Sequence, residues 1–141
     1  MPSPKTRLQF AAFPYRVVDG QPMVALVTSR ETRRWILPKG QPEKRLKPHQ
    51  VAEVEAYEEA GLIGRIVERP LCAFPSLKRL RSGREVPTEV VVFLLEVQHE
   101  LDNWPERRQR QRRWMSPGEA AAVTGEAGLV PVLLEFEALW V

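Results

Sequence analysis

The stretch LPKGQPEKRLKPHQVAEVEAYEEAGL, residues 37–62, decides the fold. Pro48 stands where the first turn of a helix tolerates proline, and Gly61 stands where helices commonly end. The residues between them predict a helix over 48–60. Small side chains recur in it at every fourth position: Ala52, Ala56 and Ala60. Because residues four apart share a helix face, this stripe lets the helix lie close against a sheet.

The same helix carries three glutamates within five positions: Glu55, Glu58 and Glu59. At 3.6 residues per turn they share one arc of its surface, where like charges repel. A divalent cation removes that repulsion, and carboxylate oxygens are suitable ligands for Mg²⁺ or Mn²⁺. Glutamate is also a good helix former, so a merely solvated helix face stays open from these residues alone.

The segments around this helix predict alternating strands and helices. Expected strands are 9–18, 22–29, 34–38, 62–77 and 88–98, and expected C-terminal helices are 117–124 and 129–140. Asp19 and Gly20 fit a tight turn between the first two strands. This interleaving predicts an α/β fold with a mixed sheet between helical layers.

Length and composition limit the class of protein. The 141 residues suit one domain, 1–141, and 43% hydrophobic with 28% charged residues is typical of a globular chain. No apolar run approaches a membrane span, and MPSPKTRLQF lacks a signal-peptide pattern, so we expect a cytoplasmic protein without a membrane partner. Cys72 is the single cysteine, which excludes an internal disulfide, and a net charge of +3 favours an anionic partner.

Residues 40–62 resemble the Nudix box, G-x5-E-x7-R-E-U-x-E-E-x-G-U, where U is a bulky aliphatic residue. Six positions match in register: Gly40, Glu55, Glu58, Glu59, Gly61 and Leu62. Two positions depart from it, because Leu46 replaces the first glutamate and Val54 replaces the arginine. The resemblance implies the Nudix α/β/α sandwich. We expect Leu46 to pack near Val54, since two apolar residues can replace an ion pair at little cost.

The resemblance extends beyond the box. TSRETRRWILPKG, with Trp35, and LDNWPERRQRQRRWMSPGEA, with Trp114, are similar to the diphosphoinositol polyphosphate phosphohydrolases, neighbours of the diadenosine polyphosphate hydrolases. This implies a metal-dependent pyrophosphohydrolase that cleaves phosphoanhydride bonds in such highly phosphorylated small molecules. The alternative is a catalytically impaired Nudix-fold protein that binds nucleotides or polyphosphates, because two box positions are lost.

The family pattern implies roles for the matched residues. Glu55 and Glu59 would hold Mg²⁺ or Mn²⁺, and the carbonyl of Gly40 would add a ligand. Glu58 would accept a proton from the attacking water, although sequence leaves open which glutamate is the base. Outside the box, Glu89 or Glu96 is an expected auxiliary acid.

A basic run, RRQRQRR, spans residues 107–113. In a strand, Arg108, Arg110 and Arg112 would point to one side and could clamp phosphate oxygens, because guanidinium groups match phosphate geometry. The alternative is a solvated edge strand protected by charge. Further cations are expected to bind the substrate or to line the same concave, positively charged surface: Arg30, Lys39, Lys78, Arg79 and Arg81.

The expected partner is therefore a phosphorylated small molecule. Nucleic-acid binding ranks behind it, since no recognised nucleic-acid motif accompanies the charge, and a homodimer is left open. Other residues receive ordinary interpretations: Trp104 and Trp140 as packing residues, and His49 as a residue without metal-binding partners.

Overall fold

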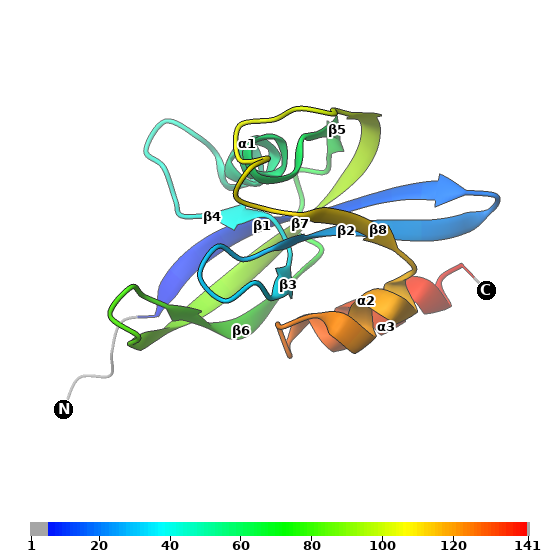
Figure 1. Ribbon diagram of the computed structural model, residues 1–141. Coiled ribbons are helices and arrows are strands. Elements are labelled where there is room, and N and C mark those ends of the chain that lie inside the picture. The colour runs from blue at the N-terminus through cyan, green and yellow to red at the C-terminus, as the bar shows by residue number, and fades with distance from the viewer. Residues whose placement is uncertain (1–5, 141) are drawn as a thin grey trace.

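The computed structural model describes residues 6–140, which form a mixed sheet between two helical layers (Figure 1). The strands are β1 Arg7–Val18, β2 Gln21–Thr28, β3 Trp35–Ile36, β4 Lys39–Gly40, β5 Leu62–Ile66, β6 Cys72–Arg79, β7 Glu85–Glu100 and β8 Arg112–Met115. The helices are α1 Pro48–Ala60, α2 Pro117–Val123 and α3 Leu129–Ala138. Helix α1 covers one face of the sheet, and α2 with α3 covers the other. The predicted α/β class is confirmed.

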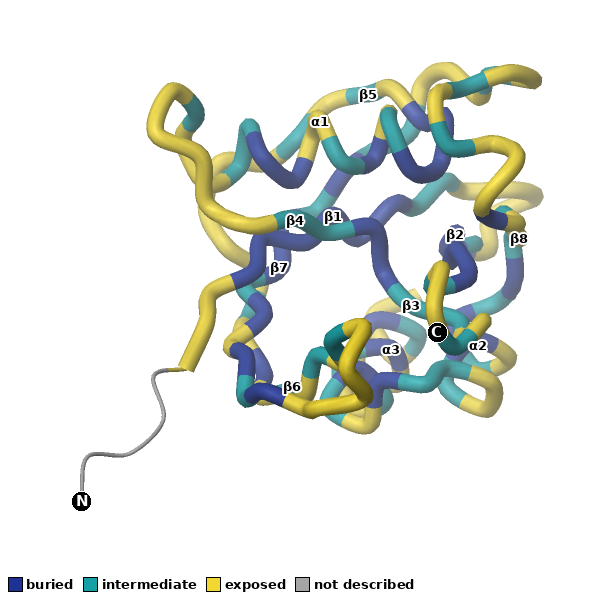
Figure 2. The backbone as a smooth tube through the Cα atoms, turned by 60° about the vertical axis from the view of Figure 1, so that its left-hand side comes forward, coloured by how far each residue is buried: buried dark blue, intermediate teal, exposed yellow. Residues whose placement is uncertain are grey.

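Strand β1 organises the sheet. It runs parallel to β7, with Arg7 opposite Thr88 and Tyr15 opposite Glu96, and antiparallel to both β2 and β4. The central order is β3-β2-β1-β7-β5. Figure 2 shows buried positions along these strands between the helical layers.

The two faces of β1 build two separate cores. Phe13 packs in the cluster that includes α2 and α3, whereas Phe10 and Ala12 pack in the cluster that includes α1. This is the side-chain alternation expected of a strand buried on both faces.

Helix α1 has the predicted bounds and orientation. Its alanines are fully buried in the core on that face: Ala52, Ala56 and Ala60. The helix ends at Gly61, which adopts a left-handed conformation with φ of 66°. A Cβ on Gly61 would also lie 2.8 Å from the Trp104 ring, so this turn needs glycine on two grounds.

Two expectations about strands are wrong. The single strand expected over 62–77 is divided, because β5 ends at Ile66 and β6 begins at Cys72. Val67 and Leu71 still donate to β7 carbonyls, so only the residues between them leave the ladder, and these include Pro70, which lacks an N–H. In the basic run, only Arg112 and Arg113 belong to a strand, so a shared face of alternating arginines does not form.

The helices within residues 6–140 are all too short or too polar to cross a membrane.

Candidate catalytic site

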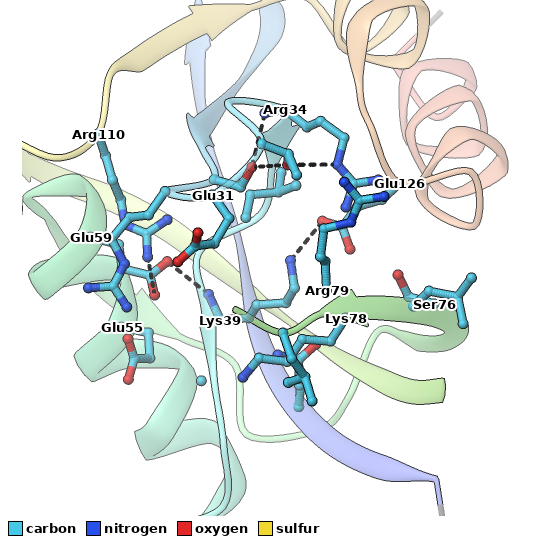
Figure 3. Close-up of a pocket in the computed structure, with 18 of the residues that line it drawn as sticks. Glu31, Arg34, Lys39, Glu55, Glu59, Ser76, Lys78, Arg79, Arg110 and Glu126 are labelled. Carbon is cyan, nitrogen blue, oxygen red and sulfur yellow. Dashed lines mark hydrogen bonds and ion pairs between the residues drawn. The ribbon is translucent and has the colours of Figure 1, made fainter. Parts of the chain in front are cut away.

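A cavity of about 480 Å³ lies between α1 and β4 on one side and the hairpin of β6 and β7 on the other. Figure 3 shows side chains of both walls pointing into it. The predicted site residues that line it are Arg30, Lys39, Gly40, Glu55, Glu58, Glu59 and Arg110, joined by Lys78, Arg79 and Arg81. The fold thus brings together an acidic helix and a basic hairpin that lie far apart in the sequence.

The acidic wall is formed by α1. Glu59 is only 5% exposed, and burial raises its pKa well above the ordinary value, against the opposing charge of Arg110. Burial also raises the pKa of the half-buried Glu55, and the charges of Glu58 and Glu106 add to the effect. The wall therefore concentrates negative charge that the protein only partly neutralises.

Gly40 on β4 lies directly against this wall. A Cβ at this position would overlap Oε1 of Glu55, so the absence of a side chain allows the main chain to approach the carboxylate. Glu59 is tied to the same strand, because its Oε1 accepts a hydrogen bond from the Lys39 N–H at 3.2 Å. The two glutamates and the main chain of β4 thus gather oxygen atoms in one corner of the cavity.

The residues of this corner fit a magnesium ion. Within the described part of the chain, no group of three or more histidine, cysteine or acidic side chains is arranged to hold a metal ion. Mg²⁺ usually takes only one or two carboxylates and completes its shell with water and substrate phosphates. Glu55 and Glu59 beside Gly40 supply that kind of open site.

The basic wall is formed mainly by the β6–β7 hairpin. Lys78 is partly buried, and burial lowers its pKa, with the positive charges of Arg7, Lys39 and Arg30 contributing. Arg79 lines the same cavity. Such crowding of cations is relieved when an anion binds.

Lys39 lines the cavity and points toward Glu126 (Figure 3). Its ammonium forms an ion pair with the buried Glu126 at 3.0 Å. The charge of Lys39 is therefore already matched inside the protein, which distinguishes it from Lys78.

The arginines of the basic run take different positions from those expected. Arg110 reaches the cavity edge, but Arg112 does not line the cavity; it donates to the carbonyls of Ala60 and Leu101 and stacks over Trp104. Arg112 thereby satisfies a carbonyl at the end of α1. Arg108 is exposed and also lies outside the cavity lining.

Three acidic residues of the cavity were not identified from the sequence: Glu31, Glu106 and Glu126. The spacing of Glu106 and Arg110, four residues apart, was the one available signal, whereas nothing in the sequence near Glu126 indicated its burial.

The expected auxiliary acids lie elsewhere, since neither lines the cavity; Glu89 is exposed and Glu96 contacts Tyr15 and Arg65.

The two altered box positions have different surroundings. Leu46 packs against the core cluster that contains α1, while the side chain of Val54 is 37% exposed and belongs to neither cluster. Leu46 therefore anchors its loop by apolar contact, and its contact with Val54 stays a prediction.

The packing role expected of Trp104 is consistent with its contacts at Gly61 and Arg112.

The sandwich and the acidic helix facing β4 define the class of domain, and the comparison with family models gives its family. The chain belongs to the NUDIX domain family, whose model matches residues 6–136. Nudix hydrolase 12, mitochondrial, of Arabidopsis thaliana is 31% identical over 116 residues, covering 80% of this chain and 57% of the relative. Nudix hydrolase 13, mitochondrial, of the same plant is 29% identical and covers 92% of this chain and 73% of the relative. The chain thus spans little more than half the length of the first of these relatives.

Solved structures share the fold. An Ap4A hydrolase of C. elegans in a binary complex has a TM-score of 0.70 and 20% identity, covering 95% of this chain and 97% of that one. The NUDIX domain of NrtR from Shewanella oneidensis, complexed with ADP ribose, has a TM-score of 0.64 and 16% identity. The match covers 94% of this chain and 88% of that one. At these identities the likeness supports the architecture.

Proposed function

We propose that this protein is a Mg²⁺- or Mn²⁺-dependent pyrophosphohydrolase that cleaves phosphoanhydride bonds in highly phosphorylated small molecules. The observation that carries the proposal is the placement of the α1 carboxylates and the Lys78 and Arg79 cations on opposite walls of one cavity. Hydrolysis of a phosphoanhydride requires neutralised phosphate oxygens and a positioned water. The two walls supply groups for both needs.

Each group of the acidic wall has a role in this reaction. Glu55 and Glu59, with the main chain at Gly40, would hold the cation. A cation held there would supply positive charge for the phosphate oxygens and would make water a better nucleophile. Glu58 lines the cavity and is partly exposed, so it can reach a water molecule and accept its proton.

The composition of the cavity supports recognition by charge. Its lining within residues 6–140 contains no phenylalanine, tyrosine, tryptophan or histidine. A nucleobase is usually held by stacking as well as by hydrogen bonds, and this cavity offers no ring for that purpose. Diphosphoinositol polyphosphates, whose recognition needs mainly cations, suit it better than dinucleoside polyphosphates, which could bind through their phosphate chain alone.

A second candidate is a polyphosphate-binding protein without turnover. It is favoured by the exposed Val54, which stands in place of the box arginine. Under this alternative the cavity binds the same ligands, but the carboxylates do not activate water.

The test is phosphate release from a panel that includes diphosphoinositol, dinucleoside and nucleoside diphosphate-sugar substrates, with Lys78→Met compared to wild type. We expect KM to rise about tenfold for the most highly phosphorylated substrates and less for the diphosphate-sugar, since one charge-assisted contact contributes about 1.5–3 kcal/mol at most. Added salt should reduce the difference. Lys44→Met is the matched control, because Lys44 is exposed and lies outside the cavity lining.

Three results would change the proposal. Binding of the panel without any phosphate release would favour the binding protein. Equal KM values for Lys78→Met and Lys44→Met on every substrate would remove the β6–β7 wall from the proposal. Tight, steeply salt-dependent binding to generic RNA or DNA would point instead to a nucleic-acid partner.

A further inference from the structure

Arg110 is held at all three nitrogens of its guanidinium by different partners. Nε donates to Oε1 of Glu106 at 2.8 Å, one terminal nitrogen donates to the carbonyl of Thr28 at 3.0 Å, and the other lies 3.4 Å from Oε2 of Glu59. Its side chain is only 7% exposed. A guanidinium bound on every side by protein has little capacity left for a phosphate group.

Two of these partners fix Arg110 to the framework of the protein. Thr28 is the last residue of β2, and the N–H of Glu106 donates to the carbonyl of Glu58 on α1 at 3.0 Å. The guanidinium therefore keeps its place without help from Glu59. Its third contact can then restrain the Glu59 carboxylate, as Figure 3 shows with a dashed line.

Both oxygens of the Glu59 carboxylate are restrained by contacts. Oε1 accepts the Lys39 N–H on β4, and Oε2 faces Arg110. With both oxygens engaged, the carboxylate plane has a defined orientation beside Gly40 and Glu55. Helix α1 cannot provide this restraint itself, because residues 48–60 contain no lysine or arginine.

The charge of Arg110 does not oppose a bound cation strongly, because Glu106 pairs with it at 2.8 Å. The pair is close to neutral as seen from the cation, so the loss of Arg110 would change the orientation of Glu59 more than the local field. An unpaired, buried Glu59 carboxylate would also be costly, which adds a reason for it to leave its present position.

We propose that Arg110 is a positioning residue, which holds the Glu59 carboxylate in the orientation that a divalent cation requires, and that it does not clamp the substrate. The inference rests on the proposed function, since it deepens the role of the same metal corner. It replaces the phosphate contact expected from the arginine run. Partners that orient a metal ligand typically contribute a factor of 10–100 to metal affinity or activity.

The experiment measures Mn²⁺ binding by electron paramagnetic resonance without substrate, for wild type, Arg110→Met, Arg110→Lys and Glu106→Gln. We expect at least about tenfold weaker binding for Arg110→Met. Arg110→Lys should be intermediate, because an ammonium keeps the charge but cannot reach three partners. Glu106→Gln should weaken Mn²⁺ binding by less than Arg110→Met does, since it weakens only one of the contacts that hold Arg110 in place. Arg107→Met, an exposed neighbour, is the matched control and should bind as wild type does.

A double variant separates positioning from general damage. In a Glu59→Gln background, Arg110→Met should cause little further loss of Mn²⁺ affinity, because the carboxylate that it orients is already gone. Independent losses that simply add would overturn the inference. Thermal unfolding of Arg110→Lys checks that the fold is intact.

Kinetics separates the inference from a substrate clamp. We expect Arg110→Met to lower kcat while KM for the phosphorylated substrate changes less than about twofold. A raised KM with unchanged Mn²⁺ affinity would identify Arg110 as a phosphate-binding residue and overturn the proposal, as would a wild type that binds no Mn²⁺. If Mn²⁺ binding by the wild type depends on both Arg110 and Glu59 but no phosphate is released, the inference stands and only the proposed hydrolase activity is contradicted.

Discussion

At the scale of single residues, the site depends on close approach. Only glycine fits at position 40 without moving Glu55, because a Cβ there would overlap Oε1 of Glu55, and Glu59 accepts a hydrogen bond from the N–H of the neighbouring Lys39. The box register identified these residues from the sequence, since a fixed spacing of chemical groups is visible in one dimension. The Glu126 partner of Lys39 was not visible, because Glu126 lies far away in the sequence and reaches Lys39 only after the chain has folded.

Gly40→Ala tests this close approach. The new methyl group would meet the far end of a flexible side chain, so Glu55 can move aside and the fold should survive with little change in Tm. Metal binding should suffer, with about a tenfold loss of Mn²⁺ affinity, because a displaced carboxylate no longer shares the corner with Glu59. Isothermal titration with Mn²⁺ measures the loss. Unchanged affinity together with unchanged Tm would show that Glu55 does not need its present position.

At the scale of elements, helix α1 was predictable and the basic run was not. Proline at the start, glycine at the end and a stripe of alanines all indicated the same helix, and they agree with its observed bounds. The run 107–113 offered charge without an apolar pattern, so sequence gave no reason to prefer a turn to a strand. The structure places Arg107 and Arg108 in a turn and Arg112 and Arg113 in β8, from which Arg112 donates to the carbonyl at the end of α1.

The charge on α1 predicts how metal and pH act together. The pKa values of Glu55 and Glu59 are raised above 4.5, so between that value and the raised ones the folded protein binds more protons than the unfolded chain. Their contribution to the free energy of unfolding is therefore present below pH 4.5 and is lost as pH rises through the raised pKa values. A bound cation offsets this loss, because it needs the ionised carboxylates.

The measurement is Tm with Mg²⁺ and with EDTA at about pH 5 and about pH 8. We expect Mg²⁺ to raise Tm more at the higher pH. Glu55→Gln, which removes one of the two charges, should show a smaller Mg²⁺ effect there. An increase in Tm that is larger at the lower pH would contradict the assignment of these carboxylates to the metal.

At the scale of the whole molecule, the sheet brings the two walls of the cavity together. The parallel pairing of β1 with β7 carries the β6–β7 hairpin to the side of β4 and α1, so Lys78 faces Glu59 across the cavity. The sequence predicted the strands and the layers but not the division at 67–71, because a proline in a long apolar stretch can be tolerated at an edge or can end pairing. The cations that line the cavity come mainly from the β6–β7 hairpin rather than from the arginine run.

The proposed hydrolysis of a phosphoanhydride depends on the carboxylates of α1 and on a divalent cation. Its most direct test is phosphate release from a diphosphoinositol polyphosphate by wild type and by Glu58→Gln, each with Mg²⁺ or Mn²⁺ and again with EDTA. We predict release by wild type that EDTA abolishes, and a loss of about 10²–10⁴-fold in kcat for Glu58→Gln, the typical contribution of a general base. Equal rates for the two proteins, or release that persists in EDTA, would contradict this account.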